Sequence, residues 1–255
     1  MAIGKVLGVE WANIASYGGV AKANIASLGG TTAPVASGPI GISDVTTTTD
    51  SSRTWTTSTG ISISLPSTAA SGDFILLIVT SDDPVTSQRI AQPSGWSDTG
   101  VSWSGTTPDT SGRVFYRTLN GTEGSSVTVF ATSNSMNRTC IGFTMIVDNI
   151  DTSSVVNAVG SAAVANARSI TAPAVTMSGT GNGLGFCIVA GDTGRADPYT
   201  FTNLTKQAES DTGRHTAAFA IKALSGGTNL PSEAISTSLT RNDGLAAIQF
   251  ILNEA

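Results

Sequence analysis

The sequence predicts an all-β protein, an antiparallel β-sandwich or jelly roll built from an internal duplication and preceded by a short-repeat arm. Three observations predict this fold. Short apolar or alternating runs are separated by Gly, Pro, Asn and Asp clusters with almost no helical periodicity. The runs form two series that match in order. The chain also begins with a tandem repeat, because Ala12–Gly19 returns as Ala23–Gly30 with one residue changed.

The repeats occupy residues 1–32. Their eleven-residue period also fits a right-handed supercoiled helix. Each unit ends in two adjacent glycines, however, which would cost roughly 2 kcal/mol in a helix relative to alanine. Short β-rungs or helical turns are therefore expected, and such units are stable mainly when they stack on one another. The alternative is a flexible low-complexity leader.

We therefore interpret residues 1–32 as an anchoring or oligomerisation arm. Its apolar contacts would come from the larger side chains of the repeats: Trp11, Ile14, Tyr17, Ile25 and Leu28.

The remaining chain divides into four segments. A Pro- and Gly-containing linker at 33–53 precedes the first β-sandwich half at 54–150, and a connection at 151–168 leads to the second half at 169–255. The connection is expected to be a strand pair or a short helix. The two halves would form either two packed lobes or one larger sandwich with a pseudo-twofold axis.

Each half supplies six strand-like runs. The first series covers residues 61–65, 74–80, 101–103, 113–119, 127–132 and 140–147, and the second covers 169–177, 184–190, 200–205, 215–224, 234–239 and 245–252. The last runs of the two series correspond without a gap at a shift of 105 residues. The first and last runs of each half are mostly apolar and are expected to be central or buried on both faces.

Turn residues separate these runs. Asn120-Gly121 predicts a β-hairpin with a type I′ turn, in which both residues need a positive φ. Gly226-Gly227 marks the equivalent turn in the second half.

Composition restricts the function classes. Charged residues make up 12% of the chain, about half the usual share, and the net charge is -5. The 13 Lys and Arg are scattered singly, so nucleic-acid binding is not expected. No apolar run approaches the length of a membrane span, and Glu10 interrupts the N-terminal run before it could form a secretory core. A durable, hydroxyl-rich composition without a signal peptide has a limited set of explanations, and one of them is a virus particle that is assembled in the cytoplasm and released by lysis.

The residues that could carry chemistry are few. Cys140 and Cys187 stand in strand-like runs without metal-ligand spacing, which favours two buried free thiols over a disulfide. His215 is the single histidine, and its place in an alternating run predicts a partly exposed strand residue. We expect no enzyme and no cofactor.

Acidic residues occur at the ends of predicted strands, beside Pro or Gly, where Asp commonly caps turns. Asp82 and Asp83 could form a calcium site with a neighbouring loop. Paired carboxylates drawn from Asp82, Asp192 and Asp197 would suit a polysaccharide depolymerase, which is the weakest hypothesis.

Aromatic residues suggest a glycan-binding module as the second hypothesis. Trp96 and Trp103 flank a Ser- and Gly-rich segment of the first half, and Tyr199 and Phe201 stand in a comparable place in the second. Sugar faces stack on such rings. The alternative is that both tryptophans close the end of the sandwich.

The repeats at Gly8–Gly30 resemble the tandem "Val-Ala-x-Ala-x-Ile-x-x-x-x-Gly-Val" units of structural proteins of tailed bacteriophages. Ser71–Thr80, Pro93–Trp96 and Arg113–Arg117 are similar to segments of β-sandwich modules in phage tail, fibre and capsid-surface proteins. The resemblance implies a non-enzymatic virion protein, assembled in the host cytoplasm and exposed on the particle. It implies contacts with other virion proteins. A homotrimer is expected because short repeats commonly bury their apolar edges around a threefold axis, and the aromatic residues make a host-surface glycan a further candidate partner. A tail fibre or other tail appendage is preferred over capsid decoration or a head fibre.

Overall fold

The computed structural model describes residues 39–51, 55–82, 89–104, 110–132, 138–192, 199–237 and 243–255, together with the backbone of six short strands before them. In these ranges the chain is all-β, and its strands pair in antiparallel sheets. This confirms the predicted fold class. The same ranges contain no helix long and apolar enough to cross a membrane.

The N-terminal repeats form three minimal hairpins. The strands are β1 (Lys5–Val6), β2 (Val9–Glu10), β3 (Ser16–Tyr17), β4 (Val20–Ala21), β5 (Ser27–Leu28) and β6 (Thr31–Thr32). They pair as β1–β2, β3–β4 and β5–β6, and each hairpin follows the previous one after eleven residues. Of the side chains proposed for the arm, Trp11, Ile14 and Ile25 lie outside the described residues, and for Tyr17 and Leu28 only the backbone is described.

The body consists of two lobes. In the first lobe, at residues 39–150, a five-stranded sheet has the order β10 (Ser97–Ser104), β11 (Ser111–Thr118), β9 (Phe74–Ser81), β13 (Cys140–Asp148) and β7 (Gly41–Asp50). A small sheet pairs β12 (Ser126–Val129) with β8 (Ile61–Ser64).

The second lobe, at residues 151–255, repeats this plan. Its large sheet has the order β14 (Val156–Val159), β22 (Asp243–Asn253), β17 (Gly183–Gly191), β20 (Thr216–Leu224) and β19 (Thr205–Asp211), and β15 (Ala163–Ala167) also pairs with β22. Its small sheet has the order β16 (Ser169–Ala172), β21 (Glu233–Ser236) and β18 (Thr200–Phe201).

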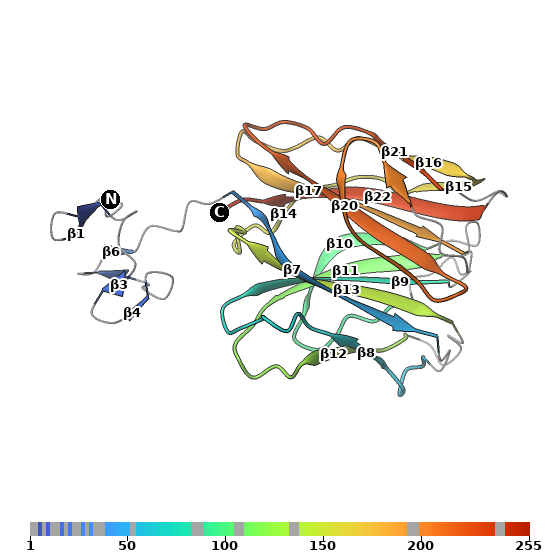
Figure 1. Ribbon diagram of the computed structural model, residues 1–255, viewed down its shortest axis with the longest axis horizontal. Coiled ribbons are helices and arrows are strands. Elements are labelled where there is room, and N and C mark those ends of the chain that lie inside the picture. The colour runs from blue at the N-terminus through green and yellow to red at the C-terminus, as the bar shows by residue number, and fades with distance from the viewer. Residues whose placement is uncertain are drawn as a thin grey trace.

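The four sheets stack as layers, with the two large sheets face to face in the middle and a small sheet outside each (Figure 1). One apolar cluster fills the space between the large sheets, and two further clusters lie under the small sheets. The central strands β9, β13 and β17 are therefore buried along almost their whole length. This double burial explains why their sequences are continuously apolar instead of alternating. The first runs of the two halves, predicted to be buried on both faces, instead form β8 and β16 of the small sheets, where buried and exposed side chains alternate.

Equivalent strands occupy equivalent places in the two lobes. β9 lies between β11 and β13 as β17 lies between β20 and β22. Thr144 in β13 donates its hydroxyl to Ser64 O at the end of β8 (2.6 Å), and Gln249, 105 residues later in β22, donates its Nε2 to Pro173 O just after β16 (2.7 Å). The internal duplication stays a prediction, which this shared plan supports. The contacts between the lobes also follow a twofold pattern. β7 of the first lobe contacts β19 of the second, and β10 of the first contacts β14 of the second.

Two predicted connections are strands of the body. Residues 41–50, which the sequence analysis assigns to the linker, form β7 and pair with β13 along their whole length. The threonine run at 46–49 looks like a linker because it is polar, but β-branched threonine suits a half-buried edge strand. The connection at 151–168, predicted as a strand pair or a short helix, contains two strands, β14 and β15, and each of them pairs with β22.

His215 is wrongly predicted as partly exposed, because it is fully buried at the boundary between the lobes. Its Nδ1 lies 3.0 Å from Gly191 O, and its Nε2 lies 2.8 Å from Thr80 Oγ1 in the first lobe. A carbonyl can only accept a hydrogen bond, so Nδ1 carries the proton and Nε2 accepts from the Thr80 hydroxyl. Burial lowers the pKa of His215 to about 4, although the Gly191 carbonyl acts in the opposite direction.

The buried imidazole predicts acid sensitivity. Above pH 6.5 His215 is neutral in the folded and unfolded chains. As the pH falls from 6.5 towards 4, only the unfolded chain binds the proton, so the folded state loses stability. Between pH 7 and pH 5 we expect this loss to be about 2 kcal/mol in urea unfolding experiments. His215→Gln should be less stable at pH 7 and should lack this part of the pH dependence. An equal pH dependence in both proteins would contradict the assignment.

The packing of Trp103 gives a second prediction. Its ring lies across Gly112 on the neighbouring strand, where an added Cβ would come within 2.1 Å of the indole. Gly112→Ala must displace the ring from the interface between the lobes, and we expect a loss of about 1–3 kcal/mol in urea unfolding. Gly181→Ala is the matched control, because no atom lies within 4 Å of the added methyl group. Equal stability of the two variants would disprove the predicted clash.

Candidate binding site in the first lobe

The two tryptophans predicted as one exposed surface lie on opposite faces of the large sheet. Trp96 is 5% exposed and packs under the small sheet, whereas Trp103 is 6% exposed and packs between the lobes. Their odd spacing of seven residues explains this, since successive side chains of a strand alternate between faces. The two rings therefore do not form one exposed stacking surface, because each packs in a different apolar cluster.

The aromatic pair of the second lobe is also part of a core. Tyr199 is buried, and the partly buried Phe201 packs against the same cluster. Lys206 Nζ donates to Tyr199 O (3.0 Å) and fixes the segment that precedes β18. These two rings serve packing in the observed fold.

The structure describes two of the acidic candidates, Asp82 and Asp192. Asp82 is buried, and its Oδ1 accepts the backbone N–H of Thr139 (2.7 Å). Asp192 is half-buried, and Asp83 and Asp197 lie outside the described residues. Within the described ranges, no three His, Cys, Asp or Glu residues come together in a way that could hold a metal ion.

Both cysteines are buried free thiols, as predicted. Burial raises the pKa of Cys140 and of Cys187. Each thiol is therefore protonated and has little nucleophilic character at neutral pH.

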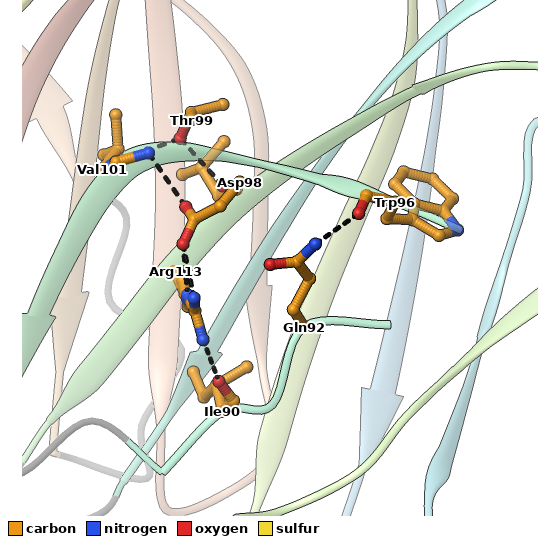
Figure 2. A network of polar contacts seen from close by, with 9 residues as sticks. Ile90, Gln92, Trp96, Asp98, Thr99, Val101 and Arg113 are labelled. Carbon is orange, nitrogen blue, oxygen red and sulfur yellow. Dashed lines mark hydrogen bonds and ion pairs between the residues drawn. The ribbon is translucent and has the colours of Figure 1, made fainter. Parts of the chain in front are cut away.

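The segment that positions Trp96 is held by a polar network (Figure 2). Gln92 Nε2 donates to Trp96 O (2.5 Å). Arg113 forms an ion pair with Asp98 and donates through Nη1 to Ile90 O (2.9 Å), which ties this segment to β11. The indole of Trp96 points away from the Arg113–Asp98 pair in Figure 2.

Two neighbouring cavities open beside this segment. The first, of about 260 Å³, is bordered by Trp96, Arg117 and Phe130. The second, of about 590 Å³, lies between residues 64–71 and 119–125. Leu65, Glu123 and Gly124 line both, so the cavities are adjacent; we call them together the Glu123 groove.

Glu123 organises the turn at the centre of this groove. Its Oε1 lies 2.5 Å from Arg117 Nη2, and its Oε2 accepts the backbone N–H groups of Gly121 (2.9 Å) and Asn120 (3.0 Å). Partial removal from water opposes ionisation, but the backbone hydrogen bonds and Arg117 outweigh it and lower the pKa of Glu123. The carboxylate is therefore ionised at neutral pH.

This turn is not the predicted hairpin. β11 and β12, which it joins, belong to different sheets, and only Gly121 of the Asn120-Gly121 pair has a positive φ, of 84°. Asn120 Oδ1 instead accepts the N–H of Thr122 (3.0 Å). Asn120 and Gly121 therefore lie in a turn that crosses from the large sheet, which contains β11, to the small sheet, which contains β12.

No family model matches the chain, and no curated protein or solved structure is similar to it.

Three lining residues of the Glu123 groove are not among the candidate site residues predicted from the sequence: Arg117, Glu123 and Phe130. For Phe130, the sequence does contain a pattern that indicates exposure. In the run from Val127, the odd-numbered residues are apolar, so an aromatic residue at 130 falls on the polar, exposed face. Arg117 and Glu123 carried no comparable signal, because their approach depends on the crossover between sheets.

The role of Glu123 in the turn can be tested by Glu123→Gln. The amide keeps one acceptor oxygen but loses the charge that Arg117 and two backbone amides stabilise, so we expect lower stability at pH 7. A lowered pKa stabilises the folded chain above pH 4.5, and that contribution is lost as the pH falls through the folded-state pKa. The stability difference between the two proteins in thermal unfolding should therefore become smaller as the pH is lowered below 4.5. A stability difference of constant size from pH 7 to pH 3 would argue against an electrostatic role.

Proposed function

We propose that this chain is a non-enzymatic structural component of a tailed-phage virion. In this proposal the N-terminal repeats dock to the particle or to copies of the same chain, and the β-body is displayed outward. The observation that carries the proposal is the regular spacing of the three N-terminal hairpins, each eleven residues after the last.

The short hairpins need a partner to be stable. Each has two residues per strand, and an isolated two-stranded hairpin is marginally stable at best in water. A regular series of such hairpins offers repeated strand edges, which neighbouring repeats or other chains can cover. This is the behaviour expected of an assembly arm.

The body has a defined end from which the arm leaves. Asn149 Nδ2 donates to Pro39 O (3.2 Å), and the N–H of Ala255 donates to Asn149 O (2.8 Å). The start of the body therefore lies beside its final residue, as Figure 1 also shows. If the arm holds this end on the particle, the opposite end of both lobes faces outward.

The composition of the body suits a durable surface protein. Its apolar clusters occupy three successive interfaces between sheets, while few charged residues contribute to the surface. We favour a tail fibre or other tail appendage, with capsid decoration or a head fibre as the second location. A homotrimer held by the arm, in contact with other virion proteins, is the expected assembly.

Removal of residues 1–38 tests this proposal. The cut leaves Pro39 and the buried Ile40 in place, so the body should fold with unchanged thermal stability. Light scattering should show a discrete oligomer, of about three chains, for the full protein and a monomer for the truncated one. Monomers in both cases, or the same oligomer in both, would overturn the role of the arm. A full-length variant with Tyr17→Ser and Leu28→Ser is the matched control, because it changes the apolar side chains of the arm without changing the length of the chain.

A further inference from the structure

We propose that the Glu123 groove binds a neutral saccharide, with the Phe130 ring as its stacking surface and the Arg117–Glu123 pair as its hydrogen-bonding group. This site differs from the predicted tryptophan pair, and it does not depend on the virion proposal. The two share no residues, because the groove lies within the body and the proposed docking lies in the arm.

The groove has the dimensions of a small-ligand site. Its cavities of about 260 and 590 Å³ adjoin at Leu65, Glu123 and Gly124. Small-molecule sites typically measure about 300–1,000 Å³. The two cavities together can thus hold a short oligosaccharide with one ring in each.

Phe130 supplies an apolar surface where the fold does not need one. It is 38% exposed and follows β12 on the outward face, whereas its neighbours Val129 and Ala131 are buried. The ring lies close to Gly60, where an added Cβ would come within 3.0 Å of Phe130 Cδ1. The same residue lines the first cavity of the groove. An exposed aromatic ring beside a cavity is suited to stack on the apolar face of a sugar.

The polar groups of the groove match a ligand that carries hydroxyl groups and no charge. Arg117 and Glu123 are the charged residues among the described residues that line the two cavities, and together they contribute no net charge. The Arg117 side chain is 23% exposed and the Glu123 side chain 9%, so the guanidinium is the more accessible of the two groups. Glu123 holds the guanidinium in place through the ion pair, and the remaining N–H groups of Arg117 can donate to vicinal hydroxyls of a sugar. Ser94, Ser126 and Thr128 add neutral hydroxyl groups to the same wall.

The second lobe shows that the β-scaffold does not require these groups. Ser97 pairs with Tyr116 as Thr205 pairs with Ile221, which makes Leu204 the counterpart of Trp96. Likewise, Val129 pairs with Ile61 as Ile235 pairs with Ile170, which makes Ser236 the counterpart of Phe130. Where the first lobe places two aromatic rings at the groove, the second has a leucine and a serine on the same framework. The rings are therefore a local property of the groove.

The test uses the full-length chain and isothermal titration with neutral gluco-, galacto- and manno-oligosaccharides, and with sialyllactose as a charged probe. We expect binding of at least one neutral oligosaccharide and no preference for sialyllactose. Phe130→Ser, which installs the residue of the second lobe, should weaken this binding at least tenfold while the melting temperature stays within a few degrees. Glu123→Gln should weaken it as well.

Val164→Ser is the matched control, because Val164 is a 58% exposed apolar residue on β15 of the other lobe. This variant should bind like the unmodified chain, and so should the chain without residues 1–38. Absence of binding to every neutral probe, or binding that Phe130→Ser leaves unchanged, would overturn the proposal. Stronger binding of sialyllactose than of every neutral oligosaccharide would contradict the proposal that the ligand is uncharged. None of these results bears on the arm, which is judged by the oligomeric state alone.

Discussion

The face-to-face packing of the two large sheets is the constraint on which the rest of the structure depends. Phe143 of the first lobe meets Phe219 of the second edge to face at 5.3 Å, and Phe186 stacks on Phe250 at 4.9 Å within the same cluster. Each large sheet thus has one face against its small sheet and the other against the opposite lobe. A lobe on its own would expose an apolar face that water disfavours.

This constraint determines which polar groups the interior can hold. His215 and Thr80 satisfy each other across the boundary between the lobes, and the Trp103 indole nitrogen reaches Thr110 Oγ1 at 3.3 Å. Buried polar groups that lose their partners cost the folded state stability. The stacked sheets therefore favour apolar strands with a few paired polar residues. Candidate binding groups are left to the outer faces, where the Glu123 groove lies.

The sequence predicts best those strands whose side chains are buried on both faces along the whole strand. β9, β13 and β17 are apolar along their length, and their double burial follows from that. β7 is missed because an edge strand with one half-buried face can be polar, and threonine fits it as well as valine does. The run after His215 is correctly predicted as a strand, β20, but His215 itself lies just before that strand. The pattern of one strand cannot show that the other lobe covers this residue.

The groove could be predicted only in part for a similar reason. The position of Phe130 follows from the alternation of a single strand, so its exposure was accessible to sequence reasoning. The meeting of Arg117 with Glu123 depends on a turn that leaves one sheet for another, and Asn120-Gly121 favours a hairpin on local grounds. Local turn preference and tertiary packing disagree at this point, and packing determines the outcome.

Native-state hydrogen exchange of a Phe219→Ala variant tests most directly whether the shared interface holds the two lobes together. Phe219 belongs to the second lobe and contacts Phe143 across the interface. Truncation of a buried phenylalanine typically costs about 3–5 kcal/mol. If the two large sheets stabilise each other, the amides of β9 and β13 should lose protection by the same free energy as those of β17 and β22. Loss of protection in the second lobe alone, with the first unchanged, would contradict this account.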